Sequence, residues 1–379
     1  MKGLPPILAF SAVILAASAS AAPLRDRVGV AHAGGKYSVS AGRDYLNEGA
    51  QLIFNDLGSR VIKLWLTRRP EASYGLNSPL WQDTPDDLVS VAAHPYYRQV
   101  FSMPFTTYIL VVDTPDSVWF GDGMSRLEED AEERALHDLT RYLMKTYAGT
   151  GKTFILQNWE ADWLVRLAVS SDTLDDRDPP LVTVNGIGRW LAARQRGVER
   201  GRARMASTKG VTVKHAIEVN HVWRAKYQPW RVSVTDDVLP GVRADMYSYS
   251  AWELGDDPTG EQLKEMLTFL DERTPGTGNI YVGEYGTAEN VHGSAAHLSQ
   301  VAVHTRAALD WGAAYVVYWQ TFCNEFAAAT PPSGTVLNGD MRGFWLVRPD
   351  GTKSPVWFYL KDLLDEPEPG PRRRSVRAR

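Results

Sequence analysis

The chain has 379 residues, of which 44% are hydrophobic and 23% are charged, and its formal net charge is −4. This length can bury a large core, and it fits either two average domains or one α/β barrel with long loops. The nearly balanced charge gives no electrostatic footprint for nucleic acid. The single cysteine, Cys323, excludes an intramolecular disulfide framework and a cysteine-rich metal site, and we expect it to be a buried apolar side chain.

Residues 1–22 have the pattern of a cleavable signal peptide. Lys2 supplies a positive charge, the run from Ile7 to Ala17 is apolar except for one serine, and Ala19-Ser-Ala21 offers a small-residue cleavage site. The apolar run is shorter than the ~20 residues of a membrane span. No later segment is long and apolar enough to cross a membrane. We therefore expect a mature protein that is secreted or periplasmic, with no stable membrane insertion.

Strand-like and helix-like segments alternate after this leader. Apolar residues recur at helical spacing from Leu46 to Leu57 before Gly58, and Ser125 with Glu128 has the pattern of a capping box. Eight strand-like segments begin near Val28, Arg60, Thr106, Thr153, Val211, Val242, Asn279 and Ala313.

Eight strands alternating with helices predict an α/β fold, a (β/α)₈ TIM barrel over residues 23–365. A doubly wound open sheet is the alternative, but it usually has fewer strands, and no glycine-rich phosphate loop follows the first strand. Residues 366–379 combine prolines with a run of arginines and are predicted to be a disordered basic tail. The arginine-rich helix over residues 190–205 is expected to be a solvated outer face.

Two apolar segments each end in a carboxylate. Residues 279–286 form a short strand that delivers Glu284 to a turn between two glycines, and residues 154–160 end in the same way at Glu160. A carboxylate at the end of a buried strand is costly unless it is paired or used. Because barrel strands end at one face, we predict that the two carboxylates act together as acid/base or nucleophile. An N-cap or ion-pair role is the plainer interpretation of each.

Eight of the 13 tryptophans follow predicted strands. Sealing of loops onto the barrel mouth explains two or three of them, whereas indole faces stack well on the C–H faces of sugar rings. His32, after the first strand, and His221, after the fifth, are placed to contact a sugar as well. We predict a carbohydrate cleft lined by at least four of Trp81, Trp119, Trp159, Trp163, Trp223, Trp230, Trp252 and Trp319.

These positions resemble the clan A glycoside hydrolases, retaining (β/α)₈ enzymes that include the family 5 cellulases and mannanases. In that clan an acid/base glutamate ends the fourth strand, a nucleophilic glutamate ends the seventh, and a tryptophan ends the eighth. The resemblance assigns the acid/base role to Glu160, the nucleophile role to Glu284 and a substrate contact to Trp319. It also implies that a tyrosine of the sixth strand, Tyr247 or Tyr249, hydrogen-bonds the nucleophile.

The resemblance covers the whole predicted barrel, with three departures. Asn158, expected directly before the acid/base residue to bind the sugar 2-hydroxyl, is separated from Glu160 by Trp159, although strand alternation lets both face the mouth. The basic residue expected on the second strand is Lys63, with Arg68 as the alternative. The His-x-Tyr pattern common near the sixth strand is missing.

We therefore predict an exported retaining glycoside hydrolase that cleaves β-linked glycosides or polysaccharides by double displacement, without metal or cofactor. No His/Asp/Glu spacing indicates a metal site, and no Gly-x-Ser-x-Gly elbow is present. The main alternative is a catalytically inactive carbohydrate-binding barrel, which would keep the tryptophans without needing two opposed glutamates. A metal-dependent barrel hydrolase is a third class. Asn324-Glu325, beyond the eighth strand, is predicted to be a loop or substrate contact.

Overall fold

The computed structural model describes residues 22–366, apart from positions 36, 38–44, 69–84, 86, 170–176, 255, 277–278 and 331. Trp81, the predicted signal peptide before residue 22 and the predicted tail beyond residue 366 lie outside the described residues, so these remain predictions. Of the helices in the described ranges, none combines the length and apolarity that a membrane crossing requires.

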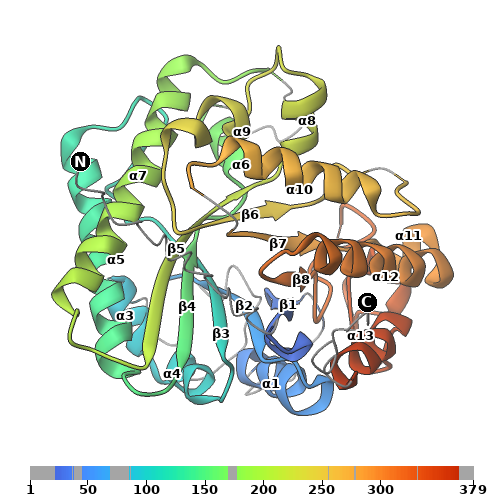
Figure 1. Ribbon diagram of the computed structural model, residues 1–379. Helices are drawn as coiled ribbons and strands as arrows, with labels where there is room; N and C mark the ends of the chain where they lie inside the picture. The colour runs from blue at the N-terminus through green and yellow to red at the C-terminus, as the bar shows by residue number, and fades with distance from the viewer. Residues whose placement is uncertain are drawn as a thin grey trace, which may run out of the picture.

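Eight parallel strands form a closed barrel in chain order, which confirms the predicted fold (Figure 1). Each strand pairs with the next, and β8 closes the barrel against β1, with Val28 opposite Val316. The sixth strand begins at Met246, later than the predicted start near Val242, and residues 242–245 form no strand. The strands are β1 (Val28–His32), β2 (Val61–Leu66), β3 (Thr107–Val112), β4 (Lys152–Gln157), β5 (Val211–Val219), β6 (Met246–Ser250), β7 (Ile280–Tyr285) and β8 (Val316–Tyr318).

Alternate side chains of each strand belong to two separate cores. On β3, Ile109 faces the barrel interior, whereas its neighbours Tyr108 and Leu110 pack against the helical layer. This follows from the two-residue period of a strand, and burial on both faces explains why the strands read as nearly continuous apolar runs. The same alternation decides which polar side chains reach the barrel interior near its mouth.

Helices cover the outside of the barrel, with α5 and α7 on the left of Figure 1, α10 above the strands, and α12 and α13 on the right. The regular helices are α1 (Tyr45–Gln51), α3 (Leu88–Ala93), α4 (Pro95–Ser102), α5 (Arg126–Thr146), α6 (Ala161–Leu167), α7 (Leu181–Arg204), α8 (Val222–Tyr227), α9 (Val234–Asp237), α10 (Glu261–Arg273), α11 (Glu289–His292), α12 (Ser294–Trp311) and α13 (Pro355–Asp365). Shorter or irregular turns are η1 (Leu24–Asp26), the π-helical η2 (Leu52–Leu57), η3 (Leu239–Gly241) and η4 (Asn338–Asp340).

Two of the predicted helix signals, a start and a stop, are confirmed. Ser125 and Glu128 form a reciprocal capping box at the start of α5. Gly58 ends η2 with φ of 93°, a left-handed conformation that glycine adopts without a steric penalty. Both signals depend on interactions within one turn, which is why the sequence alone can specify them.

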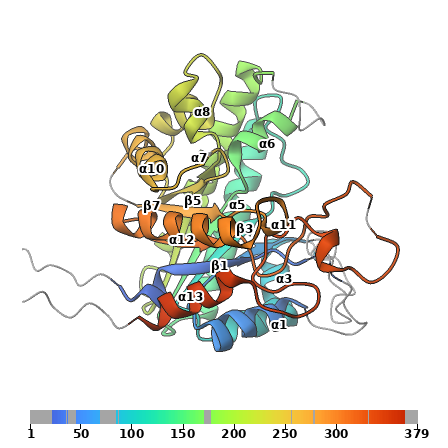
Figure 2. The same ribbon diagram turned by 90° about the vertical axis from the view of Figure 1, so that its right-hand side faces the viewer.

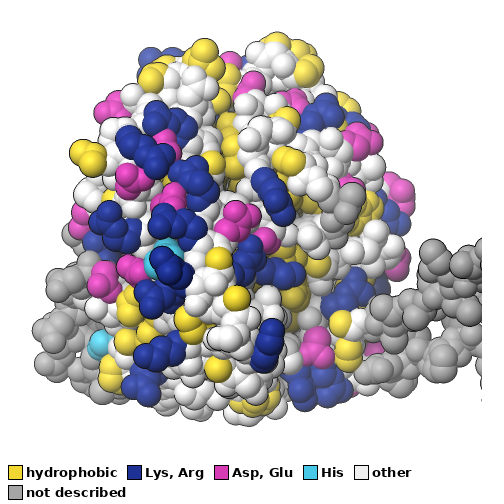
Figure 3. Space-filling view, turned by 60° about the vertical axis from the view of Figure 1, so that its left-hand side comes forward, with side chains coloured by type: hydrophobic (Ala, Val, Ile, Leu, Met, Phe, Trp, Pro, Cys, Tyr) yellow, Lys and Arg dark blue, Asp and Glu magenta, His cyan; other side chains and the backbone are white. Residues whose placement is uncertain are grey.

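The arginine-rich helix α7 is longer than predicted and packs along α5. Arg189 and Arg196 pair with Glu129 at 2.5 and 2.9 Å, and Arg196 also pairs with Glu133 at 2.9 Å. On this side of the molecule basic and acidic side chains are interspersed (Figure 3). The arginines therefore form an interhelical ladder of ion pairs with α5 at a partly exposed face.

The segment between β8 and α13 is long and carries η4. In Figure 2 it extends from the right-hand side of the barrel, toward which β1 runs, and contributes a wall to the mouth. At the other end, η1 lies beside α13, so the beginning and end of the described chain pack together.

Candidate active site

Glu284 lies at the mouth end of β7, where a β-bulge interrupts the alternation of side chains. The register between β7 and β8 shifts after Val282, and such a shift re-aims the side chains that follow it. A Cβ at Gly283 would overlap the Ser248 hydroxyl and the Glu218 carboxylate. Glycine is therefore required at position 283, where the backbone runs against these two side chains and Glu284 turns into the mouth.

The ammonium of Lys63, on β2, is buried among three acceptors. It lies 2.7 Å from Glu284 Oε1, 2.8 Å from Glu218 Oε2 and 3.3 Å from the Gly283 carbonyl oxygen. An ammonium has three protons, and these partners use all of them. The predicted substrate-binding role of Lys63 is therefore corrected: this side chain holds Glu284 in place. Arg68, the alternative, pairs with Asp116 at 2.6 Å.

Glu160 follows β4 and is only 4% exposed. Its Oε1 lies 2.6 Å from the hydroxyl oxygen of Ser250, on β6. The Ser250 hydroxyl oxygen also lies 3.2 Å from Glu284 Oε2. The indole Nε1 of Trp252 donates a second hydrogen bond to Glu284 Oε2, at 3.2 Å. Glu160 stands at the N-cap position of α6, but its side chain makes no capping bond, so helix capping does not account for its carboxylate.

The shared hydroxyl implies that one of the two carboxyls carries a proton. A serine hydroxyl has one proton to donate, so both contacts of Ser250 are hydrogen bonds only if one glutamate is protonated and donates to the Ser250 oxygen. Burial and the neighbouring Glu284 carboxylate hold the pKa of Glu160 well above its usual range. Burial also raises the pKa of Glu284, but the Lys63 ammonium opposes this. Glu160 is thus the better proton holder, and Glu284 is the better anion.

Both carboxylates line one cavity of about 1090 Å³ at the barrel mouth. Three of the predicted tryptophans line it: Trp159, Trp252 and Trp319. Trp319 meets Trp252 edge to face, with ring centroids 6.5 Å apart. The cavity therefore combines an acidic centre with indole walls. Its other lining residues come largely from the segments after β6, β7 and β8, and include Asn324, Glu325, Arg342 and Phe344.

Four of the predicted tryptophans do not line this cavity. Trp119 and Trp230 are 49% and 74% exposed, Trp163 packs against His221, and Trp223 packs against Tyr227. Among the described members of that set, three indoles line the cavity, one fewer than the four expected, and Trp81 lies outside the described residues. Trp163 and Trp223 lie on the short helices α6 and α8, so following a strand in sequence did not bring these rings to the cavity.

Three residues predicted to contact the substrate or the nucleophile do not line the cavity. His32 lies so close to Gly49 of α1 that a Cβ on that glycine would overlap the imidazole. The Tyr247 hydroxyl donates to the Val242 carbonyl and accepts from the Ala244 amide, and Tyr249 is buried in the outer core. Since alternate side chains of β6 face outward at both tyrosines, Ser250 takes the place predicted for them beside Glu284.

Asn158 and His221 are also held by the protein. The Asn158 amide donates to the Glu218 carbonyl at 2.9 Å and accepts from the Glu218 amide at 3.2 Å, so it joins β4 to β5. His221 is 4% exposed and packs edge to face on Trp163. In the described part of the chain neither lines the cavity, and the substrate contacts predicted for both are corrected to structural roles.

Sequence reasoning missed Trp65, Glu218, Ser248 and Ser250. Trp65 follows Lys63 by two positions and lines the cavity, with its ring 5.5 Å from that of Trp319. Glu218 accepts hydrogen bonds from Lys63 and from Ser248. The alternation of tyrosine and serine along β6 was the available signal, because bulky rings suit the helical layer and small hydroxyls fit inside a barrel.

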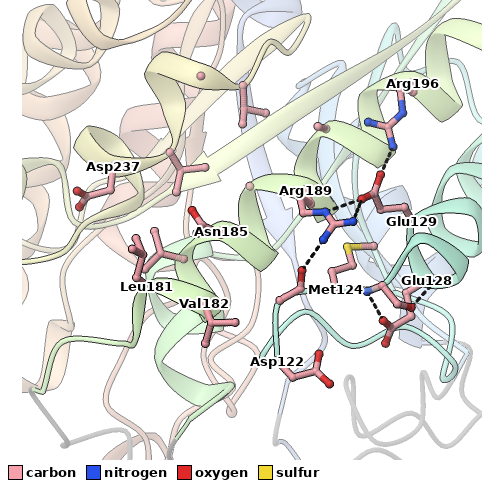
Figure 4. A pocket seen from close by; sticks show the side chains of 18 residues that line it. Asp122, Met124, Glu128, Glu129, Leu181, Val182, Asn185, Arg189, Arg196 and Asp237 are labelled. Atoms are coloured by element: carbon pink, nitrogen blue, oxygen red, sulfur yellow. Dashed lines mark hydrogen bonds and ion pairs between the residues drawn. The ribbon is translucent and has the colours of Figure 1, made fainter.

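A second large cavity, of about 1210 Å³, lies on the helical layer between the start of α5 and α7 (Figure 4). Its central charges are already paired, since Arg189 and Arg196 both reach Glu129. Glu128 is occupied as the capping residue of α5. The mouth cavity is therefore the better candidate site, because it holds the buried, interacting carboxyls. Among the described residues, no group of three or more His, Cys, Asp or Glu side chains is arranged to hold a metal ion.

No protein-family model and no curated protein matches the sequence. Similar solved structures are glycoside hydrolases. The exo-β-1,4-mannosidase Op5Man5 from Opitutaceae bacterium strain TAV5 has a TM-score of 0.55 at 13% identity, and the alignment covers 89% of this chain and 59% of the mannosidase. A GH5_18 protein from Bifidobacterium longum subsp. infantis has a TM-score of 0.54 at 12% identity, covering 90% of this chain and 80% of that one.

A GH5-4 broad specificity endoglucanase from Clostridium acetobutylicum has a TM-score of 0.51 at 10% identity, covering 89% of this chain and 96% of the endoglucanase. The chain thus has the clan A-like (β/α)₈ fold of these enzymes. It spans only about three fifths of the length of the mannosidase. At such low identity the likeness shows the fold alone.

Proposed function

We propose that this protein is a retaining glycoside hydrolase that cleaves β-linked glycosides or polysaccharides. The observation that carries the proposal is the pair of buried carboxyls, Glu160 and Glu284, bridged by one hydroxyl at the base of a cavity with indole walls. The glycosidase activities named for the similar folds support the same class. The predicted signal peptide supports a secreted or periplasmic enzyme acting on extracellular carbohydrate.

In the first step one carboxylate oxygen of Glu284 attacks the anomeric carbon. The bond from that carbon to the leaving oxygen breaks, and the leaving oxygen takes the proton of Glu160. In the second step Glu160, now ionised, removes a proton from water, whose oxygen displaces Glu284 from the sugar. Glu160 regains its proton and Glu284 its charge, so the site returns to its starting state.

The spacing of the carboxyls supports retention over inversion. Because Ser250 contacts both, the two carboxyl oxygens that it contacts are separated by no more than the combined length of the two contacts, about 5.8 Å. Retaining enzymes place their carboxyls about 5–5.5 Å apart, whereas inverting enzymes need about 6.5–9.5 Å to admit water between carboxylate and sugar.

The test is a screen of the purified protein on aryl β-glycosides, including mannosides and glucosides, and on β-linked polysaccharides. Glu284→Ala should abolish turnover on any substrate found, and added azide should restore part of it with inverted product configuration, because one displacement then replaces two. Circular dichroism should show that the variant is folded. Binding of a polysaccharide without turnover, or full activity of Glu284→Ala, would instead favour the non-catalytic carbohydrate-binding barrel.

A further inference from the structure

A third carboxylate, Glu218, lies beneath the proposed catalytic pair. It faces the barrel interior from β5 and is 0% exposed, as is Lys63. Its Oε2 accepts from Lys63 at 2.8 Å and from the Ser248 hydroxyl at 2.9 Å. The proposed displacement uses Glu160 and Glu284, and Glu218 takes no part in it. A buried carboxylate is costly to keep, so its presence calls for a physical reason.

Lys63 is shared between two carboxylates. Its ammonium lies 2.7 Å from Glu284 and 2.8 Å from Glu218, and each contact is both an ion pair and a hydrogen bond. The backbone contact with Gly283 uses its third proton, so the ammonium has one defined position. Glu284 therefore receives only part of the stabilisation that Lys63 can supply, and the Glu218 charge raises the pKa of Glu284.

The sharing matters most when Glu284 reacts. As Glu284 bonds to the anomeric carbon, its carboxylate becomes a neutral ester. It then no longer balances the positive charge of Lys63. A buried cation without a partner is strongly unfavourable. Glu218 forms no bond in this step and lies 2.8 Å from the ammonium, so the charge of Lys63 remains balanced in the glycosyl-enzyme. No proton has to leave Lys63 during the step.

We infer that Glu218 is a positioning residue that holds Lys63 and keeps its charge balanced while Glu284 forms and breaks its bond to the sugar. The inference rests on the proposed glycosidase function and adds a residue to it. Titratable groups around this centre come from several strands: Lys63 from β2, Glu160 after β4, and Glu284 and Tyr281 from β7. Any pH effect of Glu218 has to be separated from theirs.

Glu218→Gln is the primary test, because it keeps the shape and an acceptor for Lys63 but removes the charge. Lys63 then stabilises ionised Glu284 more strongly, so the acidic limb of kcat/KM should move to lower pH by about one to two units. Glycosylation by a substrate with a good leaving group should slow about 10- to 100-fold, since Glu284 becomes a weaker nucleophile and Lys63 loses its second counter-ion.

Glu132→Gln is the matched control. Glu132 forms another fully buried ion pair, with Arg194 at 2.7 Å, between α5 and α7. Removing its charge should lower thermal stability, as Glu218→Gln also should through the loss of a buried pair, while the acidic limb of kcat/KM stays in place. Equal limb positions for wild type and Glu218→Gln would overturn the inference.

Ser248→Ala provides a second test if Glu218→Gln does not fold. This change removes the hydroxyl donor from Glu218, so Glu218 interacts more strongly with Lys63, and Lys63 stabilises ionised Glu284 less. The acidic limb of kcat/KM should therefore move to higher pH. A limb that stays in place or moves down would count against the inference. Carbon-13 NMR titration of the Glu284 carboxyl in both variants gives the same comparison without a substrate. If the wild type hydrolyses no glycoside, the proposed function fails, and the NMR shifts still decide whether Glu218 controls Glu284.

Discussion

At the scale of single residues, Trp252 supplies the only indole hydrogen bond to Glu284 that the described residues contain, at 3.2 Å. This bond lowers the pKa of Glu284. Trp252→Phe keeps an aromatic wall but removes the donor, so the pKa of Glu284 should rise. Because the nucleophile has to be ionised, the acidic limb of kcat/KM should move to higher pH, by about half to one unit for the loss of one such bond.

Trp319→Phe is the comparison for this prediction. Trp319 lines the same cavity and packs edge to face on Trp252. Its replacement should raise KM through weaker stacking while the acidic limb stays where it is. If both variants move the limb equally, the shift comes from repacking of the indole wall, and the hydrogen bond is not its cause.

Glu160→Ala should separate the two chemical steps. Substrates with good leaving groups need no protonation and should still form the glycosyl-enzyme, whereas deglycosylation should slow on the order of 10²–10⁴-fold because no base activates water. Azide should accelerate this step and yield a glycosyl azide of retained configuration. Pre-steady-state release of the aryl group measures the burst. The absence of any dependence on the leaving group would reverse or remove the role proposed for Glu160.

At the scale of elements, α7 approaches α5 closely because glycines face the contact. A Cβ at Gly197 would overlap the Glu133 carbonyl oxygen, whereas a Cβ at Gly188, in the same helix, would meet its nearest neighbour at an ordinary 3.5 Å. Gly197→Ala should therefore lower the free energy of unfolding by about 1–3 kcal/mol. Gly188→Ala should raise it by about 0.5–1 kcal/mol, because alanine restricts the unfolded chain and favours helix.

Denaturant unfolding of both variants measures these opposite signs. The pair shares one helix and one chemical change, so the difference between them isolates the space available at each position. A stabilised Gly197→Ala would mean that the two helices separate at little cost.

The elements themselves could be predicted from the sequence, and the site only in part. Strand periodicity and caps act over a few residues, so eight strands and the capping box of Ser125 were foreseeable. The two glutamates reach one cavity as expected. The direction of Tyr247 and Tyr249 was missed, because the resemblance suggested tyrosine where the alternation of β6 presents serine. The bulge in β7 depends on contacts between strands and has no local signal apart from Gly283.

At the scale of the whole molecule, barrel closure gathers side chains that are far apart in sequence. Lys63 and Glu284 are separated by 221 positions and meet at 2.7 Å. Packing of α12 against β7 and β8 also buries a histidine. His297 lies between the Thr287 hydroxyl, at 3.1 Å, and the Tyr318 hydroxyl, at 3.4 Å, and burial lowers its pKa to about 4. The free energy of unfolding should therefore depend on pH through a residue that lies outside the proposed active site.

This dependence predicts a loss of stability in acid. The pKa of His297 is about 4 in the folded protein and about 6.5 in an unfolded chain, so between these values the unfolded state binds the proton more readily. The free energy of unfolding should then fall as the pH drops through this window, with His297 contributing about 2–3 kcal/mol by pH 4. Glu132, whose pKa burial raises to about 7, acts in the opposite sense over part of the range, so the pH dependence of the wild type alone does not isolate the contribution of His297.

His297→Gln keeps polar atoms near Thr287 and Tyr318 but cannot be protonated. Chemical denaturation of both proteins at pH 8 gives the cost of the lost contacts, and the difference between them should shrink or change sign toward pH 4.5. A constant difference across that range would show that His297 does not carry the acid sensitivity.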